Sequence, residues 1–167
     1  LIQVDSIGIP QGARMWTYLE NCGITDIAGV WQSRLGNMLT VISIKQRFPG
    51  HAKRVASAAI SAPGDYCKFI IIVDDDIDPS NLSEVMWAVA TRCDPESSID
   101  IVRGCVGTPL DPRLPPEKKA NGDYTTSAAI IDATKPYTWI NEFPAVNRFT
   151  PEFRARVVDK WRMVLGT

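Results

Sequence analysis

The run Phe69-Ile70-Ile71-Ile72-Val73 is the most continuously apolar segment of this 167-residue chain. Because its residues do not alternate between apolar and polar, a strand formed by them must be covered on both faces, which is typical of a central parallel strand in an α/β domain. The acidic cluster Asp74-Asp75-Asp76-Ile77-Asp78 follows at once. Beyond it, Asn81 and Glu84 have the spacing of a helix cap. The segment therefore predicts a buried strand that leads through a turn into a helix.

Further strands and helices are expected on both sides of this strand. Residues 27–31 and 38–44 are β-branched or aromatic runs, and the short linker 33–37 favours an antiparallel hairpin between them. Shorter apolar runs predict two more strands; they lie at 99–102 and 128–131. Helical spacing, caps and prolines predict four helices; they span 10–21, 52–62, 82–93 and 151 onward.

The order of these elements indicates a single α/β domain over residues 1–167. Right-handed crossovers should place strands 38–44, 69–73 and 99–102 parallel, with strand 27–31 antiparallel at an edge. We therefore expect a mixed, mostly parallel sheet with βαβ crossovers, an antiparallel N-terminal hairpin strand, long irregular loops and a C-terminal helix.

Composition excludes several classes of protein. Hydrophobic residues make up 45% and charged residues 22%, and 18 Lys+Arg face 19 Asp+Glu, which argues against disorder and against nucleic-acid binding. No run reaches the roughly 18 apolar residues of a membrane span, and no signal peptide is visible, so we expect a cytoplasmic protein without membrane contact. The four cysteines lack C-x-x-C spacing and only one histidine is present, so we expect buried reduced thiols and no structural zinc.

Two charged clusters could carry chemistry. Asp74 and Asp76 form an Asp-x-Asp pair at a strand end, which suits Mg²⁺ or Mn²⁺ in a metal-dependent nucleotide-sugar transferase. Alternatively, the cluster caps the next helix and pairs with basic residues such as Lys53 and Arg54. The basic segment 45–54 contains His51 and enters a helix, where it could bind an anion.

Several blocks together resemble the C-terminal domain of the UbiD-type reversible decarboxylases. The blocks are Val41-Ile42-Ser43-Ile44-Lys45-Gln46, Gly50-His51-Ala52-Lys53-Arg54-Val55, the strand with its acidic turn, and Ala90-Thr91-Arg92-Cys93-Asp94-Pro95. Thr108-Pro109-Leu110-Asp111-Pro112 and Ala129-Ile130-Ile131-Asp132-Ala133-Thr134 extend the resemblance over most of the chain and favour the hydroxybenzoate or phenolic acid type.

This resemblance implies an enzyme that uses prenylated FMN to act on aromatic, heteroaromatic or α,β-unsaturated carboxylic acids. In that family the flavin, its Mn²⁺ or Mg²⁺, the K⁺ and the catalytic residues belong to an N-terminal domain. These 167 residues, which begin without methionine, are then expected to be a C-terminal third that is inactive alone and has no catalytic, cofactor-binding or metal-binding residue of its own. The acidic cluster becomes a structural turn.

The expected tasks of such a domain are to wall the substrate pocket and to build a homo-oligomer, a dimer or larger. Residues where loops begin after strands or before helices are the candidates for the pocket wall; they are Ile9, Gln11, Lys45, Thr108 and Leu110. The helix within residues 146–167 presents apolar side chains and is expected to contact a neighbouring subunit. A third interpretation is a pure assembly module that takes no part in the pocket.

Overall fold

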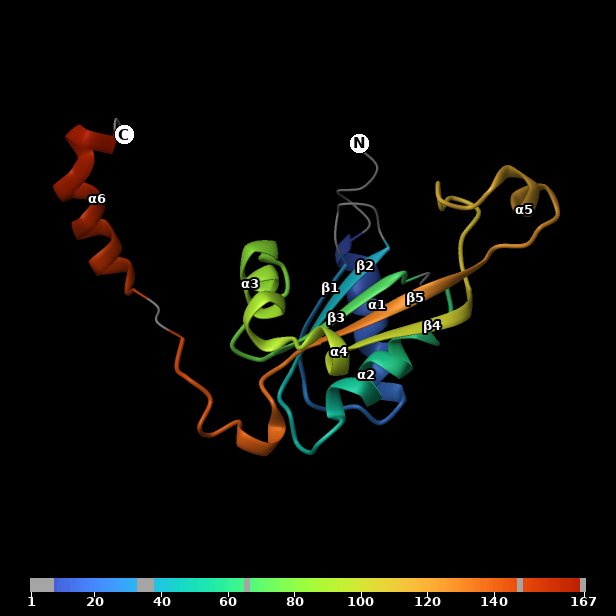
Figure 1. Ribbon diagram of the computed structural model, residues 1–167, viewed down its shortest axis with the longest axis horizontal. Helices are drawn as coiled ribbons and strands as arrows, with labels where there is room; N and C mark the ends of the chain where they lie inside the picture. The colour runs from blue at the N-terminus through green and yellow to red at the C-terminus, as the bar shows by residue number, and fades with distance from the viewer. Residues whose placement is uncertain (1–7, 33–37, 65–66, 147–148, 166–167) are drawn as a thin grey trace.

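The computed structural model describes residues 8–32, 38–64, 67–146 and 149–165. The chain forms an α/β domain around one five-stranded sheet with the order β1-β2-β3-β5-β4 (Figure 1). The strands are β1 (Ile27–Gln32), β2 (Leu39–Ile44), β3 (Phe69–Asp74), β4 (Ile99–Val106) and β5 (Thr125–Ala133). The helices are α1 (Gly8–Asn21), α2 (His51–Ile60), α3 (Leu82–Arg92), α4 (Pro95–Ser98), α5 (Pro116–Ala120), the 3₁₀ turn η1 (Tyr137–Trp139) and α6 (Pro151–Leu165).

The central strands are parallel and both edge strands are antiparallel. β3 pairs in parallel with β2 and with β5, whereas β1 and β4 run antiparallel to β2 and β5. The mixed α/β fold, its antiparallel hairpin strand and its C-terminal helix are thus confirmed. The linker predicted at 33–37 lies outside the described residues.

One predicted strand direction is wrong. Residues 99–102 were expected to be parallel to β3, but they begin β4, which pairs antiparallel with β5 at the other edge. The third parallel strand is β5, which is inserted between β3 and β4. The cause is a hairpin: β4 continues to Val106 and returns through α5 into β5, so no crossover separates these two strands.

Two hydrophobic clusters cover the two faces of the sheet. Ile70 and Ile72 of β3 pack with side chains from α1 and α2, such as Leu19 and Val55. On the opposite face, the intervening β3 residues pack with Val85 and neighbouring residues of α3. The continuous apolar run of β3 is therefore explained by burial on both faces, as its sequence predicts.

The edge strand β4 is interrupted by a bulge. The register with β5 shifts between Arg103 and Cys105, and Gly104 between them has a φ of 74°. A positive φ of this size is favourable for glycine and strained for other residues. Arg103 is exposed at this bulge.

Helix α6 stands away from the sheet at the end of an extended segment that leaves β5 (Figure 1). Its described apolar side chains are all exposed; they are Phe153, Val157, Val158, Trp161 and Val164. Trp87 and Trp139 are also exposed, by 39% and 44%. Among the described residues, none of the helices combines the length and apolarity needed to cross a membrane.

The cysteines are all unpaired thiols, as predicted. Cys67 is buried and hydrogen-bonds with Thr40, Cys93 and Cys105 are partly exposed, and Cys22 is exposed, so the prediction of burial holds fully only for Cys67 and is wrong for Cys22. Cys22 lies just beyond α1, where the chain turns at Gly23 and no layer covers it.

Candidate functional site

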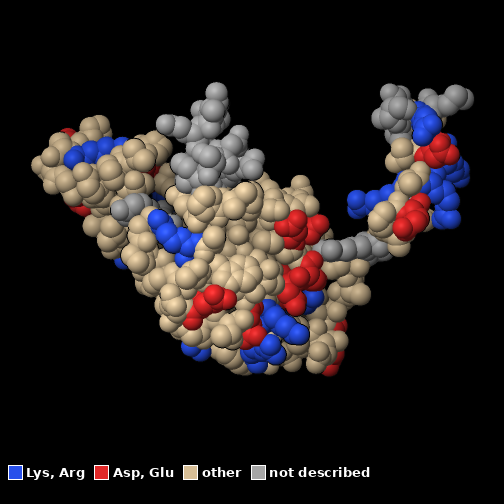
Figure 2. All heavy atoms as spheres, turned by 180° about the vertical axis from the view of Figure 1, so that it is seen from behind, with Lys and Arg blue, Asp and Glu red and all other residues tan. Residues whose placement is uncertain are grey.

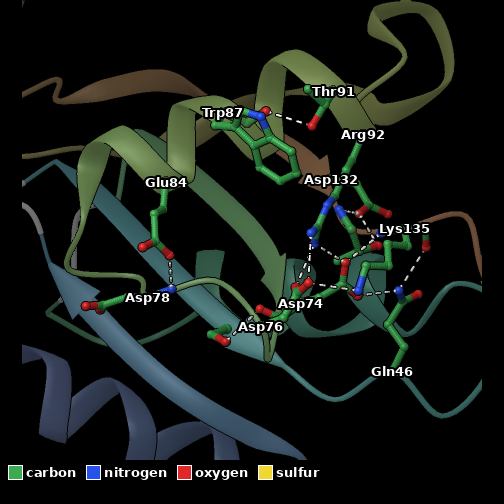
Figure 3. Close-up of polar contacts among 12 residues, drawn as sticks. Gln46, Asp74, Asp76, Asp78, Glu84, Trp87, Thr91, Arg92, Asp132 and Lys135 are labelled. Atoms are coloured by element: carbon green, nitrogen blue, oxygen red, sulfur yellow. Dashed lines mark hydrogen bonds and ion pairs between the residues drawn. The ribbon is translucent and has the colours of Figure 1, made fainter. Parts of the chain in front are cut away.

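The carboxyl ends of the three parallel strands meet at one edge of the sheet and bring polar side chains together. Asp74 is the last residue of β3, Gln46 follows β2, and Lys135 follows β5. Arg92, the last residue of α3, points into the same edge from above (Figure 3). In open α/β sheets this edge is the usual place for a ligand site.

Arg92 joins the two aspartates that the Asp-x-Asp pattern singled out. Its Nη1 lies 2.7 Å from Asp74 Oδ2 and 2.9 Å from Asp76 Oδ1, while Nη2 lies 2.9 Å from Asp76 Oδ2. Lys135 adds two contacts, because its backbone N–H donates to Asp74 Oδ2 at 2.7 Å and its Nζ to Asp76 Oδ2 at 2.9 Å. Gln46 Nε2 donates to the other oxygen of Asp74 at 2.7 Å and also to the carbonyl of Lys135.

This cluster is buried at its centre. The side chains of Arg92 and Asp74 are 0% and 4% exposed, and that of Asp76 is 33% exposed. Burial raises the pKa of Asp74, while the hydrogen bonds from Lys135 and Gln46 and the charge of Arg92 oppose that rise. Burial also acts on Asp76, but hydrogen bonds from Arg92 and Lys135 outweigh it and lower its pKa to about 2.

Two aromatic rings flank the guanidinium. The Arg92 carbon Cζ lies 5.3 Å from the centre of the Trp87 ring and 5.9 Å from that of Phe143. Phe143 belongs to the segment that leaves β5 toward α6. The cluster therefore ties together α3, the three strand ends and the start of the segment that carries α6.

The acidic turn leads into α3, and the residue that caps this helix is Asn81 rather than one of the aspartates. Asn81 Oδ1 accepts from the backbone N–H groups of Ser83 and Glu84, and Asp78 accepts from Ser80. The carboxylates of Asp74 and Asp76 form ion pairs with Arg92 and Lys135. In the described part of the chain, no three His, Cys, Asp or Glu side chains are grouped to hold a metal ion.

The predicted partner of this acidic cluster is wrong. Lys53 was expected to pair with it, but its Nζ lies 2.6 Å from Asp100 Oδ2 on β4. The helix α2 lies on the opposite face of the sheet from α3, and Lys53 turns toward β4. His51 is buried against Phe48, and this burial lowers the pKa of its imidazole.

The candidate pocket residues lie at two different edges of the sheet. Lys45 is exposed and follows the carboxyl end of β2. Thr108 and Leu110 follow β4, whose last residue Val106 is paired with the first residue of β5. They therefore lie at the amino edge of the parallel strands, and the structure does not bring them together with Lys45 within this domain.

Ile9 and Gln11 lie in the first turns of α1, beside β1. Ile9 is 65% exposed and lines a cavity of about 640 Å³ between α1, β1 and the turn at Pro79. Gln11 Oε1 is buried and has no hydrogen-bond partner among the described residues. Leu110 is 84% exposed, and Thr108 Oγ1 accepts the backbone N–H of Leu110.

Residues 6–133 match the protein family described as the 3-octaprenyl-4-hydroxybenzoate carboxy-lyase C-terminal domain. The chain belongs to the UbiD family. It is 44% identical over 98 residues to a phenolic acid decarboxylase of Sedimentibacter hydroxybenzoicus. This alignment covers 58% of this chain and 19% of that enzyme. It is also 33% identical over 132 residues to a phenolic acid decarboxylase of Bacillus subtilis strain 168. That alignment covers 78% of this chain and 27% of that enzyme.

Solved structures of the UbiD class share the fold. The UbiD-class enzyme HmfF from Pelotomaculum thermopropionicum, in complex with FMN, is 28% identical with a TM-score of 0.74; the match covers 89% of this chain and 32% of HmfF. The chain thus spans between a fifth and a third of the proteins named here.

The metal ion of a flavin site would need carboxylate oxygens that are free to bind it. The Asp-rich cluster does not fit, because Arg92 and Lys135 already neutralise its two inner carboxylates. We therefore assign no chemical step through a flavin to the residues of this domain.

Sequence reasoning identified the aspartates but missed Arg92 and Lys135. Arg92 looks like a surface residue that complements a helix C-terminus. Lys135 follows a short strand with no pattern of its own. The one available signal was the block Ala90-Thr91-Arg92-Cys93-Asp94-Pro95, which the resemblance contains.

Proposed function

We propose that this domain is the C-terminal part of a UbiD-type decarboxylase that acts in the cytoplasm on aromatic, heteroaromatic or α,β-unsaturated carboxylic acids through prenylated FMN. The observation that carries this proposal is the continuous family match over residues 6–133. The named relatives, two phenolic acid decarboxylases and an enzyme solved with FMN, favour an aromatic acid and a flavin.

In this proposal the N-terminal domain of the enzyme supplies the prenylated FMN, the divalent metal ion, the K⁺ and the catalytic residues. The 167-residue chain alone is then inactive. This division agrees with the ion pairs of Asp74 and Asp76, whose carboxylates face protein cations. The same ion pairs disfavour the alternative of a metal-dependent nucleotide-sugar transferase.

The experiment compares the complete enzyme with residues 1–167, both supplied with prenylated FMN, on 4-hydroxybenzoate and protocatechuate. Release of CO₂ by the complete enzyme alone is the expected result. Turnover by residues 1–167, or stoichiometric flavin binding to them, contradicts the proposal.

We also propose that the loop carrying Thr108 and Leu110 contributes to the wall of the substrate pocket. Leu110 is 84% exposed in this domain, and we expect another part of the complete enzyme to cover this apolar side chain. In the complete enzyme, Leu110→Ala should change the ratio of kcat/KM between two acids by up to about tenfold, as one pocket contact allows. Lys53→Gln is the matched control on the far side of the sheet, and an unchanged ratio removes Leu110 from the wall.

Helix α6 is proposed to bind a second copy of the chain in a homo-oligomer. Its exposed Phe153, Val157 and Trp161 form an apolar face that this domain leaves uncovered. Parts of the predicted region 146–167 lie outside the described residues. Trp161→Glu should shift the complete enzyme to smaller particles in light scattering, whereas Arg154→Glu should not. If the unaltered enzyme is a monomer, the proposal is contradicted. If the domain serves assembly alone, Leu110→Ala leaves the ratio of kcat/KM between the two acids unchanged.

A further inference from the structure

A basic cavity of about 550 Å³ lies at the amino edge of the sheet, far from the Asp74 cluster. It opens between the β4 bulge, the loop before α5 and the first residues of β5. Its charged lining residues are all cations; they are Lys68, Arg103, Arg113 and Lys118. Figure 2 shows basic side chains on the lobe that carries the α5 loop.

Two of the four cations have carboxylate partners. Lys68 Nζ lies 2.8 Å from Oδ2 of Asp111, whose side chain is 3% exposed. Lys118 Nζ lies 3.2 Å from Asp123 Oδ2 and also donates to the carbonyl and hydroxyl oxygens of Thr125. These two lysines are therefore neutralised and held in place.

The two arginines differ from the lysines. Within the described residues, neither Arg103 nor Arg113 has a hydrogen bond or ion pair from its guanidinium group. Arg103 lies at the bulge beside Gly104, and a hydrogen bond from the backbone N–H of Arg113 to Asp111 Oδ1 fixes the turn that carries Arg113. Two uncompensated positive charges thus line one cavity in a chain whose net charge is −1.

The floor and rim of the cavity add apolar and hydroxyl groups to its basic lining. Leu114 is 7% exposed and gives an apolar floor, and Thr126 and Ser127 add hydroxyl groups. A guanidinium group binds carboxylate and phosphate oxygens in a two-pronged geometry that few other side chains offer. The volume lies within the range of small-molecule sites.

We propose that Arg103 and Arg113 form a binding site for a small oxyanion, a phosphate or carboxylate group. The site is separate from the Asp74 cluster, and the oxyanion can bind there without any decarboxylation step. This proposal is independent of whether the enzyme acts on aromatic acids.

The test uses phenylglyoxal, which modifies accessible guanidinium groups, on the complete enzyme with mass spectrometry of each arginine. Inorganic phosphate should slow the modification of Arg103 and Arg113 by about threefold once its concentration is about twice the dissociation constant. Arg154 of α6, the residue used above as the control outside the oligomer interface, serves as the control in the same sample and should not be slowed. Benzoate replaces phosphate in a second arm: protection by both anions indicates a general oxyanion site, and protection by phosphate alone indicates a phosphate site.

A shared ligand also predicts coupling between the two arginines. Arg103→Gln should reduce the protection of Arg113 to the level of Arg154, whereas Arg154→Gln should leave the protection of Arg113 intact. Equal slowing of all three arginines, no slowing by either anion, or full protection of Arg113 in Arg103→Gln each overturns the proposal. Because no turnover is measured, failure here leaves the decarboxylase proposal standing, and the reverse also holds.

Discussion

Replacing Arg92 with methionine removes the cation from the centre of the Asp74 cluster while keeping an apolar stem. The guanidinium is fully buried and makes one contact to Asp74 and two to Asp76. Among the described residues, its loss leaves the carboxylate of Asp74, which is 4% exposed, with only the hydrogen bonds from Gln46 and the backbone of Lys135. Removing one partner of a buried pair costs about 3–5 kcal/mol, and we expect a loss of that size at pH 7.

Urea unfolding followed by circular dichroism measures this loss in residues 1–167. Lys53→Gln is the control, because the Lys53–Asp100 pair is exposed by 57% and 37% and such pairs contribute about 0–1 kcal/mol. The double variant Asp74→Asn/Arg92→Met should recover part of the loss, since the amide carries no charge that needs a partner.

The pH dependence separates charge from packing. Protonation of Asp74 removes the uncompensated charge, so the loss caused by Arg92→Met should be smaller at pH 4 than at pH 7. A loss below about 1 kcal/mol, or an equal loss at both pH values, would refute the view that Arg92 stabilises the domain by compensating a buried carboxylate.

Three further predictions concern other parts of the chain. Asp76 has a pKa near 2 in the folded chain against 3.8 for the free side chain, so its stabilisation is present above pH 4 and is lost as the pH falls from about 4 to 2; Asp76→Asn should remove this part of the acid unfolding curve. Gly107→Ala should cost about 1–3 kcal/mol in urea unfolding, because its Cβ would lie 2.6 Å from the backbone oxygen of Tyr124. Millimolar Mg²⁺ or Mn²⁺ should not raise the Tm, because Arg92 and Lys135 engage the carboxylates; a clear rise would contradict this.

Local sequence patterns were sufficient to predict those elements whose burial or capping determines the residue types directly. The apolar run at 69–73 predicted a strand covered on both faces, and Asn81 with Glu84 predicted the start of α3. The strand directions at the far edge were not predictable in this way. Residues 99–102 and 128–131 have the same apolar character in either direction, and only the β4–β5 hairpin, closed through a long loop, decides between them.

The candidate site shows the same limit. Asp74 and Asp76 were visible as an Asp-x-Asp pair, but their partners Arg92 and Lys135 are distant in sequence and meet them only at the carboxyl edge of the folded sheet. The basic cavity was not predicted, because its arginines lie in segments that read as a strand and an irregular loop.

The bulge in β4 also bears on aggregation. Ile99, Ile101 and Val106 are exposed on this outermost strand, and an unbroken apolar edge is a template for pairing with another molecule. The shifted register at Gly104 breaks the row of free amide and carbonyl groups into two short pieces, with a charged Arg103 between them. An edge interrupted in this way is a poorer template for intermolecular β-sheet than a continuous one.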